Sequence, residues 1–457
     1  MPSVALFTGP FDPPVQHHRR VAELLSSRFE TVLVVPGGPR AGNTKSPFSP
    51  SVHRATMSDL NFRGLDNVSV DLDDLEDDCF TPHHEVESRL RDVGKQVSFV
   101  VSTELVRGGR IGQSFVQREW QDGERLWNES HFTVLRELHE PLDLADCPPR
   151  HEILAVEPHL RSESVRSMMT FDEPADAHLH APVAAYIRRQ GLYRDVTMAR
   201  LPGFRLAGPR IGLFVDERNP EARAVASTLQ QYVSNDPELI VSIGGDGTML
   251  RAIRSHWRDR LPFFGINAGG QGFLLNGRIP NSFWTHDLLL YHLPLLHVET
   301  EFRDGRVIES YAFNDAWVER STGQTAWLRV RVNGIERVSK LVGDGLLVAT
   351  AAGSSSYARA MGATPVPMNT DVLVLAGSNV YLPTFWRPAL LPTDSIIEIE
   401  TLDVNRRPLR VAIDGYEEEG PVRKMTVRVS RTAAAEVAFL PEHDPVAKLA
   451  FMQFPSS

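Results

Sequence analysis

A glycine-rich turn directly after an apolar segment is the feature that most constrains the fold. Residues Glu238–Ile243 have the composition of a buried β-strand and lead without a break into Gly244-Gly245-Asp246-Gly247-Thr248. Glycine lets the backbone turn tightly and approach a ligand without a Cβ in the way. A strand preceding such a turn is typical of a βαβ unit, so we expect a parallel α/β fold around an anion-binding turn.

The residues around this turn extend the pattern. Arg210–Val215 is predicted to form a strand and Pro220–Val233 a helix. After about residue 283 the sequence changes to short alternating strands with turn signals, as in Trp327–Val332 before Asn333-Gly334 and in Ser395–Glu400. This spacing is typical of an antiparallel sandwich or barrel.

The first half of the chain also alternates strands with amphipathic stretches. Val4–Phe7 and Thr31–Val35 are predicted strands on either side of a helix at His18–Phe29. A helix at Ala181–Gln190, ending at Gly191, closes this part. The pattern predicts a second parallel α/β sheet.

The length of 457 residues suggests two to four domains at about 150 residues each. Periodicity is lost near Pro202 and Gly203, which indicates a linker. We therefore expect an α/β fold class with an α/β domain at 1–195, a linker at 196–208, an α/β lobe at 209–285 and an all-β sandwich lobe with a C-terminal return at 286–457.

Charge and cysteine content exclude several functions. The 48 basic and 58 acidic residues give a net charge of −10, the wrong sign for wrapping nucleic acid. Two cysteines, Cys79 and Cys147, are too few for a disulfide framework or a thiolate zinc site, which favours the reducing cytoplasm. We expect no membrane span, because no apolar run approaches about 20 residues. The acidic cluster Asp71–Asp78 is predicted to be a solvated loop, and no metal site built by the protein is expected.

The turn Thr8–Pro14 lies between the first strand and the first helix. Phosphate groups dock at such positions because unpaired N–H groups and the helix dipole face them. His18, which follows the turn, would donate a hydrogen bond to charge developing on a transferred phosphate. The alternative is a tight turn with a solvent-exposed basic cap.

Gly9, Phe11, Asp12 and Pro13 match the motif G-x-F-[DN]-P, and His18 matches the second histidine of the H-x-G-H that follows it. The sequence here resembles the nicotinamide or nicotinate mononucleotide adenylyltransferase family, which has this motif. The resemblance extends over residues 1–195 through three further groups: Pro36, Lys45, Arg54 and Met57; Ser162 and Arg166; and Val183, Tyr186, Ile187, Leu192 and Tyr193. It implies a Rossmann-like nucleotidyltransferase domain in which His18 is catalytic. The residues that it implies bind nucleotide are Gly9, Phe11, Lys45, Ser162 and Arg166.

The first half departs from that family at several positions. Val15 replaces the first histidine or threonine, and Ser102-Thr103-Glu104 replaces G-A-D. Glu163 puts a carboxylate in the loop that binds the ATP phosphates, which is unfavourable unless it turns away. An active domain and an inactive or repurposed one both remain open.

Asp246 is the candidate catalytic group of the second half. A carboxylate beside phosphates serves as a general base toward a hydroxyl or helps to hold magnesium. The alternative is an ordinary turn, in which aspartate is frequent. The loop alone resembles diacylglycerol kinases, sphingosine kinases, phosphofructokinases and NAD kinases.

Later motifs resemble NAD kinases specifically. They are Phe264–Leu274, Asn314-Asp315, Gly343–Tyr357 and Ile413-Asp414-Gly415. The resemblance implies an α/β lobe and a β-sandwich lobe that bind NAD and ATP, with Asp344 at the nicotinamide end. The implied nucleotide-binding residues are Gly244, Gly245, Gly247, Thr248, Phe273, Asn314, Asp315, Asp344, Ser355, Tyr357 and Asp414.

Three departures from NAD kinases affect substrate preference more than chemistry, because Asp246 and its flanking glycines remain. They are Ala351-Ala352, Gly362-Ala363 and Ala376-Gly377. Losing a hydroxyl at Ala352 removes a hydrogen bond worth about 0.5–1.5 kcal/mol.

The leading hypothesis is an NAD kinase that uses ATP and Mg²⁺, and the resemblance implies a homo-oligomer. A second is a bifunctional enzyme whose N-terminal domain first makes the dinucleotide from ATP and nicotinamide or nicotinate mononucleotide. A third is a non-catalytic NAD(P)-binding regulator. A lipid or sugar kinase that shares only the glycine loop is disfavoured by Asn314-Asp315.

Overall fold

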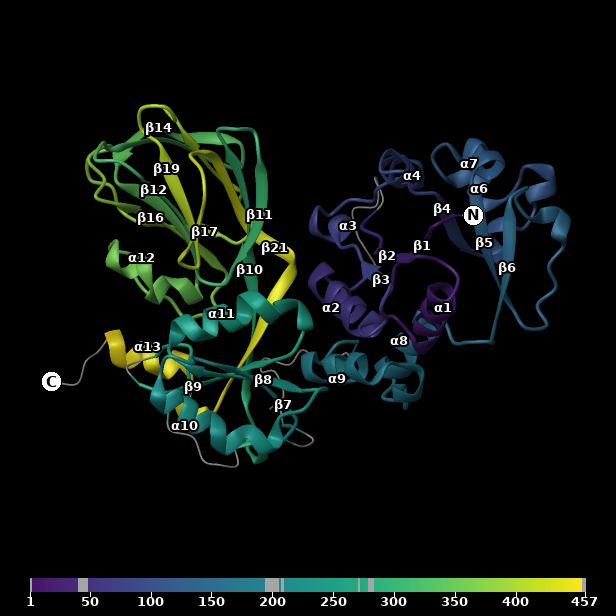
Figure 1. Cartoon of the computed structure of the whole chain (residues 1–457), viewed down its shortest axis with the longest axis horizontal. Helices are drawn as coiled ribbons and strands as arrows, with labels where there is room; N and C mark the ends of the chain where they lie inside the picture. Colours follow the sequence, from purple (N-terminus) through teal and green to yellow (C-terminus); the bar gives the residue numbers. More distant parts are fainter. Residues whose placement is uncertain are drawn as a thin grey trace. The chain divides into compact units, whose positions relative to one another are not determined.

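The computed structural model describes residues 2–39, 48–193, 205–206, 209–269, 272–277 and 283–453. They form two compact units, Met1–Pro202 and Gly203–Ser457, whose elements are labelled in Figure 1. Of the expected linker 196–208, only Arg205 and Leu206 are described, and Leu206 is buried in a hydrophobic core of the second unit.

The N-terminal unit is built on a six-stranded parallel sheet. Its strands are β1 (Val4–Gly9), β2 (Thr31–Pro36), β3 (Val68–Val70), β4 (Val97–Ser102), β5 (His131–Glu137) and β6 (His151–Val156). The order is β3-β2-β1-β4-β5-β6, so the direction of strand addition reverses between β1 and β4. This is the doubly wound arrangement in which ligands bind beyond the carboxyl ends of the strands at the reversal.

The helices of this unit are α1 (Gln16–Ser26), α2 (Ser51–Phe62), α3 (Asp73–Glu76), α4 (His83–Asp92), α5 (Thr103–Val106), α6 (Phe115–Glu119), α7 (Gly123–Glu129), α8 (Ser162–Thr170) and α9 (Ala181–Gln190). The closing helix and its left-handed Gly191 (φ 65°) are confirmed. The first helix begins two residues earlier than predicted and ends three residues earlier.

The prediction of a solvated loop at Asp71–Asp78 is wrong in its central part. Residues 73–76 form α3, and Asp74 and Glu76 are buried, with 3% and 6% exposure. The Asp74 carboxylate accepts the backbone N–H of Thr81 at 3.1 Å. The run of acidic residues did not indicate that the segment around Thr81 would contact Asp74.

The C-terminal unit contains two sheets and four α-helices among the described residues. The strands are β7 (Ile211–Val215), β8 (Leu239–Gly244), β9 (Phe263–Asn267), β10 (Leu289–Phe302), β11 (Val307–Ala312), β12 (Asp315–Arg320), β13 (Ala326–Val332), β14 (Ile335–Gly343), β15 (Gly345–Thr350), β16 (Val372–Ser378), β17 (Ala389–Pro392), β18 (Ile397–Thr401), β19 (Leu409–Ile413), β20 (Tyr416–Glu418) and β21 (Val422–Phe439). The helices are α10 (Pro220–Leu229), α11 (Asp246–His256), α12 (Tyr357–Ala360) and α13 (Pro445–Gln453).

Strands β7, β8 and β9 pair in parallel and carry α10 and α11 on opposite faces (Figure 1). Alternation along β8 explains this arrangement. Val241 and Ile243 pack in the core that contains Ala222 and Leu229 of α10, whereas Ile240 packs with Met249 of α11.

The long strand β21 connects the two parts of this unit. Its end pairs in parallel with β9 at Val437, and its middle pairs with β18 at Val427. One nine-stranded sheet therefore runs from the α/β part into the β-rich part. It packs against the six-stranded antiparallel sheet β17-β16-β15-β12-β19-β20 through a shared apolar core, so the predicted sandwich architecture is confirmed.

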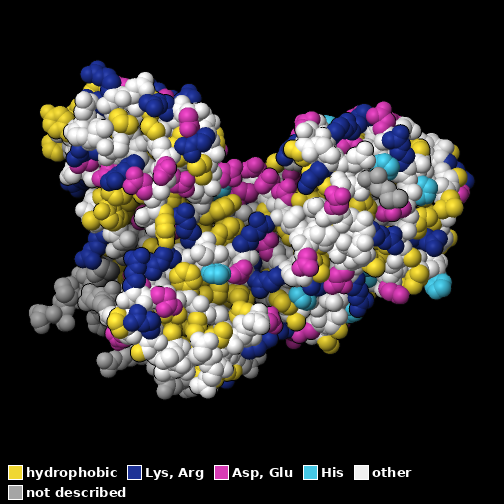
Figure 2. Space-filling view, viewed as in Figure 1, with side chains coloured by type: hydrophobic (Ala, Val, Ile, Leu, Met, Phe, Trp, Pro, Cys, Tyr) yellow, Lys and Arg dark blue, Asp and Glu magenta, His cyan; other side chains and the backbone are white. Residues whose placement is uncertain are grey.

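In the part of the chain that the structure describes, no helix is long and apolar enough to cross a membrane. On the face drawn in Figure 2, basic and acidic side chains are interspersed over both units.

Candidate functional site

The glycine turn of the second unit joins β8 directly to α11. Gly244 ends the strand, Gly245 is the extended N-cap residue, and Asp246 is the first residue of the helix. The N–H groups of Thr248 and Met249 donate to the carbonyl of the N-cap residue Gly245. Those of Asp246 and Gly247, before them, have no earlier carbonyl of the helix to reach, so they and the helix dipole favour an anion.

Two glycines of the turn leave room for such an anion. A Cβ placed on Gly245 or Gly247 would meet no described atom within 4 Å. At Gly244 the same Cβ would lie 2.5 Å from Thr248 Oγ1, so this glycine is required by internal packing. Thr248 is buried, and its Oγ1 accepts a hydrogen bond from Arg251 at 3.1 Å. The Thr248 hydroxyl is therefore engaged within the protein, as is its N–H, which donates to the carbonyl of Gly245 at 2.9 Å.

The carboxylate of Asp246 is held by the segment that follows β9. It accepts the backbone N–H of Phe273 at 2.8 Å and that of Leu274 at 3.0 Å. Burial raises the pKa of Asp246, while these two N–H groups and the charge of Lys448 lower it. The contacts fix the orientation of the carboxylate beside the glycine turn.

A cavity of about 370 Å³ lies next to α11 in the second unit. Its lining residues are Leu250, Asn314, Asp315, Trp317, Glu319, Ser356, Tyr357, Arg410, Ala412, Asp414, Gly415 and Glu417. Leu250 is four residues after Asp246, so both lie on one face of the helix about 6 Å apart along its axis. The structure thus brings four predicted residues, Asn314, Asp315, Tyr357 and Asp414, to a cavity one helical turn from Asp246.

Asn314 and Asp315 are buried polar groups on the cavity wall, with 6% and 8% exposure. The side-chain Oδ1 of Asn314 is buried and has no hydrogen-bond partner among the described residues. Burial, and then the charge of Asp414, raise the pKa of Asp315 to about 7. Buried polar atoms without partners are uncommon, so this pair has capacity left for a polar ligand.

Asp414 positions this pair through the backbone. Its carboxylate accepts three N–H groups, from Phe313 at 2.7 Å, Asn314 at 2.8 Å and Asp315 at 3.1 Å. Its backbone is left-handed (φ 47°), in the turn between β19 and β20. Both carboxylate oxygens are thereby used within the protein.

The α12 region contributes an aromatic wall. Tyr357 is 53% exposed and packs on Trp317 with ring centroids 4.9 Å apart. The predicted Ser355 does not line the cavity and donates instead to the carbonyl of Ala352 at 3.2 Å. Its neighbour Ser356 lines the cavity.

Asp344 does not line this cavity. Strands β12 and β15 are antiparallel, with Asp315 opposite Ala349 and Glu319 opposite Gly345. Asp344 therefore lies roughly 17 Å from the Asp315 end, at about 3.4 Å per residue. Its carboxylate accepts hydrogen bonds from Asn379 at 2.7 Å and from Arg320 Nε at 2.5 Å, and these bonds, that of Asn379 first, lower the pKa of Asp344. Asp344, which we expected at the nicotinamide end, therefore does not line this cavity within one chain, because it and Asp315 lie at opposite ends of the paired strands β12 and β15.

Sequence reasoning missed two cationic residues that hold this site together. Arg254 of α11 donates to the carbonyl of Ile413 at 3.4 Å and lies 4.3 Å from the ring centroid of Tyr416. It is eight residues after Asp246, so helical periodicity was an available signal. Lys448 donates to the carbonyl of Leu275 across 173 residues, and no local pattern indicates that contact.

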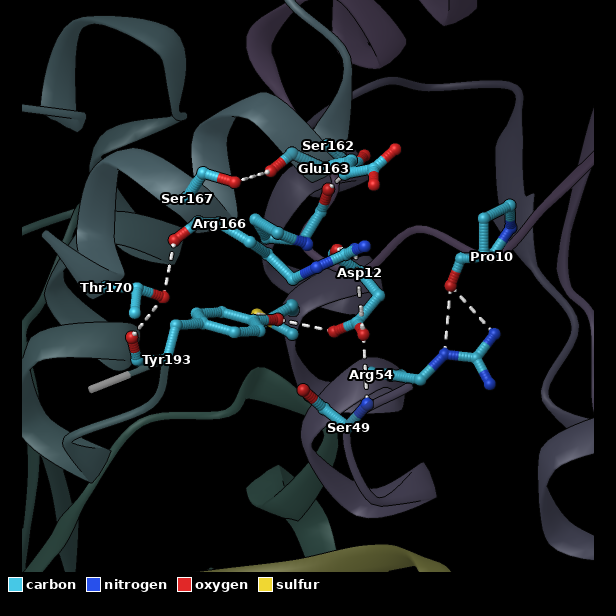
Figure 3. A network of polar contacts seen from close by, with 12 residues as sticks. Pro10, Asp12, Ser49, Arg54, Ser162, Glu163, Arg166, Ser167, Thr170 and Tyr193 are labelled. Carbon is cyan, nitrogen blue, oxygen red and sulfur yellow. Dashed lines mark hydrogen bonds and ion pairs between the residues drawn. The ribbon is translucent and has the colours of Figure 1, made fainter. Parts of the chain in front are cut away.

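The N-terminal turn forms a closed network around Asp12 (Figure 3). Asp12 is 1% exposed, and its carboxylate accepts from the Tyr193 hydroxyl at 2.5 Å and from the Ser49 N–H at 2.9 Å. Arg54 donates to the carbonyls of Pro10 and Gly37, each at 2.7 Å. The turn is therefore anchored from α2 and from the residues after α9.

Two residues expected to bind phosphate are also tied to this turn. Arg166 donates to the carbonyl of Asp12, and Ser162 donates to that of Pro13 at 2.8 Å. Glu163 is exposed. Lys45 lies outside the described residues.

Gly9 ends β1, and Phe11 is buried in a left-handed conformation (φ 43°). The ring of His18 meets Phe11 edge-on, with centroids 5.0 Å apart. Its Nδ1 accepts the N–H of Val15 at 3.0 Å, so the proton of the neutral ring resides on Nε2. Burial, and then the charges of His17 and His159, lower the pKa of His18 to about 3.

A second cavity, of about 420 Å³, lies in the N-terminal unit beside α1 and the end of β6. Its lining residues are Val15, Gln16, His17, Arg20, Val21, Leu24, Leu138, Ala155, Val156, Glu157, Pro158, His159, Leu160, Ala177 and His178. His17 and His159 stack at 3.3 Å on its wall. None of the predicted N-terminal site residues lines it, although His17 adjoins His18. Across the described ranges, no group of three or more His, Cys, Asp or Glu side chains is arranged to hold a metal ion.

Comparison with known families agrees with this division. The family described as ATP-NAD kinase N-terminal domain matches residues 194–292, and the cytidylyltransferase-like family matches residues 6–173. The NAD kinase of Rickettsia bellii is 31% identical over 239 residues, which cover 51% of this chain and 93% of the relative. That of Xylella fastidiosa is 31% identical over 259 residues, covering 54% and 97%.

Solved structures give weaker likenesses. An NAD kinase from Archaeoglobus fulgidus in complex with ATP is 21% identical and covers 53% of this chain and 98% of its own, with a TM-score of 0.41. Yeast NADH kinase complexed with NADH is 15% identical and covers 79% and 89%, with a TM-score of 0.43. On the sequence relatives, which are matched over almost their whole length, the chain belongs to the NAD kinase family.

Proposed function

We propose that the C-terminal unit transfers the γ-phosphoryl group of ATP to the adenosine 2′-hydroxyl of NAD. The observation that carries this proposal is the cavity with Asn314 and Asp315 on its wall, one helical turn from Asp246 and the open glycine turn. Family membership supports the same reaction. It also disfavours a lipid or sugar kinase and a purely regulatory protein.

In the proposed reaction the 2′-oxygen forms a bond to Pγ, and the bond between Pγ and the β,γ-bridging oxygen breaks to release ADP. Asp246 takes the proton of the attacking hydroxyl, with its carboxylate oriented by the N–H groups of Phe273 and Leu274. The open backbone at Gly245 and Gly247 binds the phosphates.

Asn314 and Asp315 are proposed to bind the hydroxyl and amino groups of the dinucleotide, because together they offer donors and acceptors over a short reach. Tyr357 lines the same pocket with its ring. Magnesium, when bound with ATP, neutralises charge on the phosphates. Its ligands would be the oxygens of those phosphates, which fits the preference of Mg²⁺ for hard oxygen donors.

The test is NADP formation from NAD, ATP and Mg²⁺ by the full-length protein, compared with Asp246→Ala. We expect a loss of about 10²–10⁴-fold in kcat, the range for a general base. Asp304→Asn, in the exposed turn between β10 and β11, is the control and should keep full activity. Undiminished NADP formation by Asp246→Ala would refute the assigned role.

We also propose a second activity for residues 1–195, joining ATP to nicotinamide or nicotinate mononucleotide. The mononucleotide phosphate attacks Pα of ATP, and pyrophosphate leaves. The β3-β2-β1-β4-β5-β6 sheet and the cytidylyltransferase-like match support this proposal. In the neutral His18 ring, the Nε2–H is available to donate to the phosphate.

The Asp246→Ala protein tests this activity without onward phosphorylation. Incubation with ATP, Mg²⁺ and each mononucleotide should accumulate the corresponding dinucleotide, identified by mass. If neither mononucleotide yields a product, the bifunctional proposal fails while the kinase proposal stands.

We assign the expected domains 1–195, 209–285 and 286–457 to these functions, and we propose a cytoplasmic homo-oligomer. Both cysteines are free thiols in the structure, in keeping with a reducing compartment. Light scattering of the purified protein and fractionation of cells would test the assembly and the location.

A further inference from the structure

The C-terminal helix α13 returns to the α/β part of the second unit and is anchored there. Asp444, just before the helix, accepts the N–H of Val446 at 3.0 Å and the hydroxyl of Tyr291 at 2.7 Å. Leu449 is buried, with 3% exposure. One face of α13 therefore packs on the fold, and Lys448 lies on it.

Lys448 is partly buried and has a specific partner. Its ammonium donates to the backbone carbonyl of Leu275 and lies 5.6 Å from the ring centroid of Phe439. The segment that it grips is the one that holds Asp246, since Phe273 and Leu274 donate their N–H groups to that carboxylate. Three successive residues are thus fixed by two side chains, one from each end of the C-terminal unit.

The two side chains also act on each other through charge. Lys448 lowers the pKa of Asp246 against the effect of burial, and Asp246 and Asp444 raise the pKa of Lys448 against the same effect. In a site of reduced dielectric, a cation near a carboxylate stabilises its ionised form. The glycine turn Gly244–Thr248 itself contains no Lys or Arg.

We propose that Lys448 is a positioning residue for phosphoryl transfer, which fixes residues 273–275 and through them the orientation of the Asp246 carboxylate. The inference rests on the proposed kinase function and adds the C-terminal helix to its machinery. Removing the cation loosens the segment and makes the carboxylate harder to ionise.

The test compares Lys448→Met, which keeps the length of the side chain but not its charge, with Lys448→Arg. Lys424→Met is the matched control, because it removes the same charge at a different place, on β21. There Lys424 pairs with Glu398 at 3.7 Å. We expect Lys448→Met to lower kcat at least about tenfold, with KM for NAD within about threefold. Lys448→Arg should recover most of the loss.

The pH profile separates positioning from packing. Loss of a nearby cation raises the pKa of Asp246, so the acidic limb of kcat against pH should move to higher pH in Lys448→Met and stay in place in Lys448→Arg. The other titratable or charged groups around Asp246 and Lys448 are Asp216, Arg251, Tyr291, His443 and Asp444. All of them are retained in every variant, so a shift of the limb is assigned to Lys448.

Amide hydrogen exchange of residues 272–277 gives a readout that needs no activity. Protection of the Phe273 and Leu274 amides should fall in Lys448→Met and persist in Lys448→Arg and Lys424→Met. Unchanged protection together with an unmoved acidic limb overturns the inference while leaving the kinase proposal intact. If wild-type protein makes no NADP, the kinase proposal fails, and the loss of protection then decides whether Lys448 fixes the segment.

Discussion

The carboxylate of Asp414 accepts the backbone N–H of Asn314 at 2.8 Å, and this contact holds one wall of the cavity beside α11. Neighbouring bonds from Phe313 and Asp315 complete the set. The charge of Asp414 is therefore directed at the start of β12 rather than at a ligand. Asp414, which we expected to bind nucleotide, lines the cavity and also holds the backbone of Asn314 and Asp315 on its wall.

Replacing Asp414 should weaken binding more than chemistry. Asn tolerates the left-handed backbone at this position, but its amide turns one acceptor into a donor that faces backbone N–H groups. We expect Asp414→Asn to lose about 1–3 kcal/mol of stability and to raise KM for NAD more than it lowers kcat. Thermal melting and steady-state kinetics check this, and a fall in kcat with unchanged KM would contradict it.

Asp315 should make stability depend on pH. Its folded pKa is about 7, against roughly 3.9 for an unfolded aspartate. The proton that Asp315 holds in the folded state stabilises that state, and this stabilisation is complete below about pH 4. It is lost as the pH rises through about 7. Asp315→Asn removes the titration, so the free energy of unfolding of the variant should rise relative to that of wild type across that window. The rise should be at most about 1.4 kcal/mol per pH unit. Urea unfolding at four pH values measures the difference, and a constant difference would exclude the assignment.

Local patterns were enough to predict the elements that carry the site. The apolar run before Gly244 placed β8, and the glycines placed the start of α11. Asn314 was predicted as a site residue from its motif, and the structure places it on the cavity wall. The predictions of β8 and of the start of α11 succeeded because strand periodicity and turn chemistry act over a few residues, whereas Asn314 was predicted from the resemblance to NAD kinases.

Contacts between distant segments could not be predicted in this way. Asp344 is close to Tyr357 in sequence, but a strand carries it to the other end of the sheet. Ser355 and Ser356 are adjacent in sequence, but Ser355 belongs to the short 3₁₀ helix Ala352–Ser355 and only Ser356 lines the cavity. The hydrogen bond from Lys448 to the Leu275 carbonyl depends on the long strand β21, which brings the chain back to the α/β part of the unit.

The glycines should separate stability from ligand binding. Gly247 lies in α11 with open space beside it, so Gly247→Ala should leave stability unchanged or raise it by up to about 1 kcal/mol. It should nevertheless raise KM for ATP, because the added methyl group occupies the approach to the backbone. At Gly265 a Cβ would lie 2.5 Å from Leu275 Cδ2, so Gly265→Ala should destabilise by about 1–3 kcal/mol. Equal melting temperatures for the two variants would contradict this reading.

Tyr193 should matter to the N-terminal unit through Asp12. Its hydroxyl donates to the Asp12 carboxylate, which is 1% exposed, and this contact raises the pKa of Tyr193 further above its usual value after burial. Tyr193→Phe removes one donor from a buried carboxylate and leaves the Ser49 N–H on the other oxygen. Since an unsatisfied buried acceptor costs about 1–3 kcal/mol, the melting temperature of this unit should fall.

The same substitution at Tyr381, which is 76% exposed, provides the matched control and should leave the melting temperature unchanged. Dinucleotide formation should fall with Tyr193→Phe as well, because Arg166 donates to the carbonyl of Asp12 and its guanidinium shifts when that residue moves. NADP formation from NAD should be retained, because Tyr193 belongs to the N-terminal unit. A Tyr193→Phe protein that melts like Tyr381→Phe would show that the turn is held by Arg54 and Arg166 without the hydroxyl.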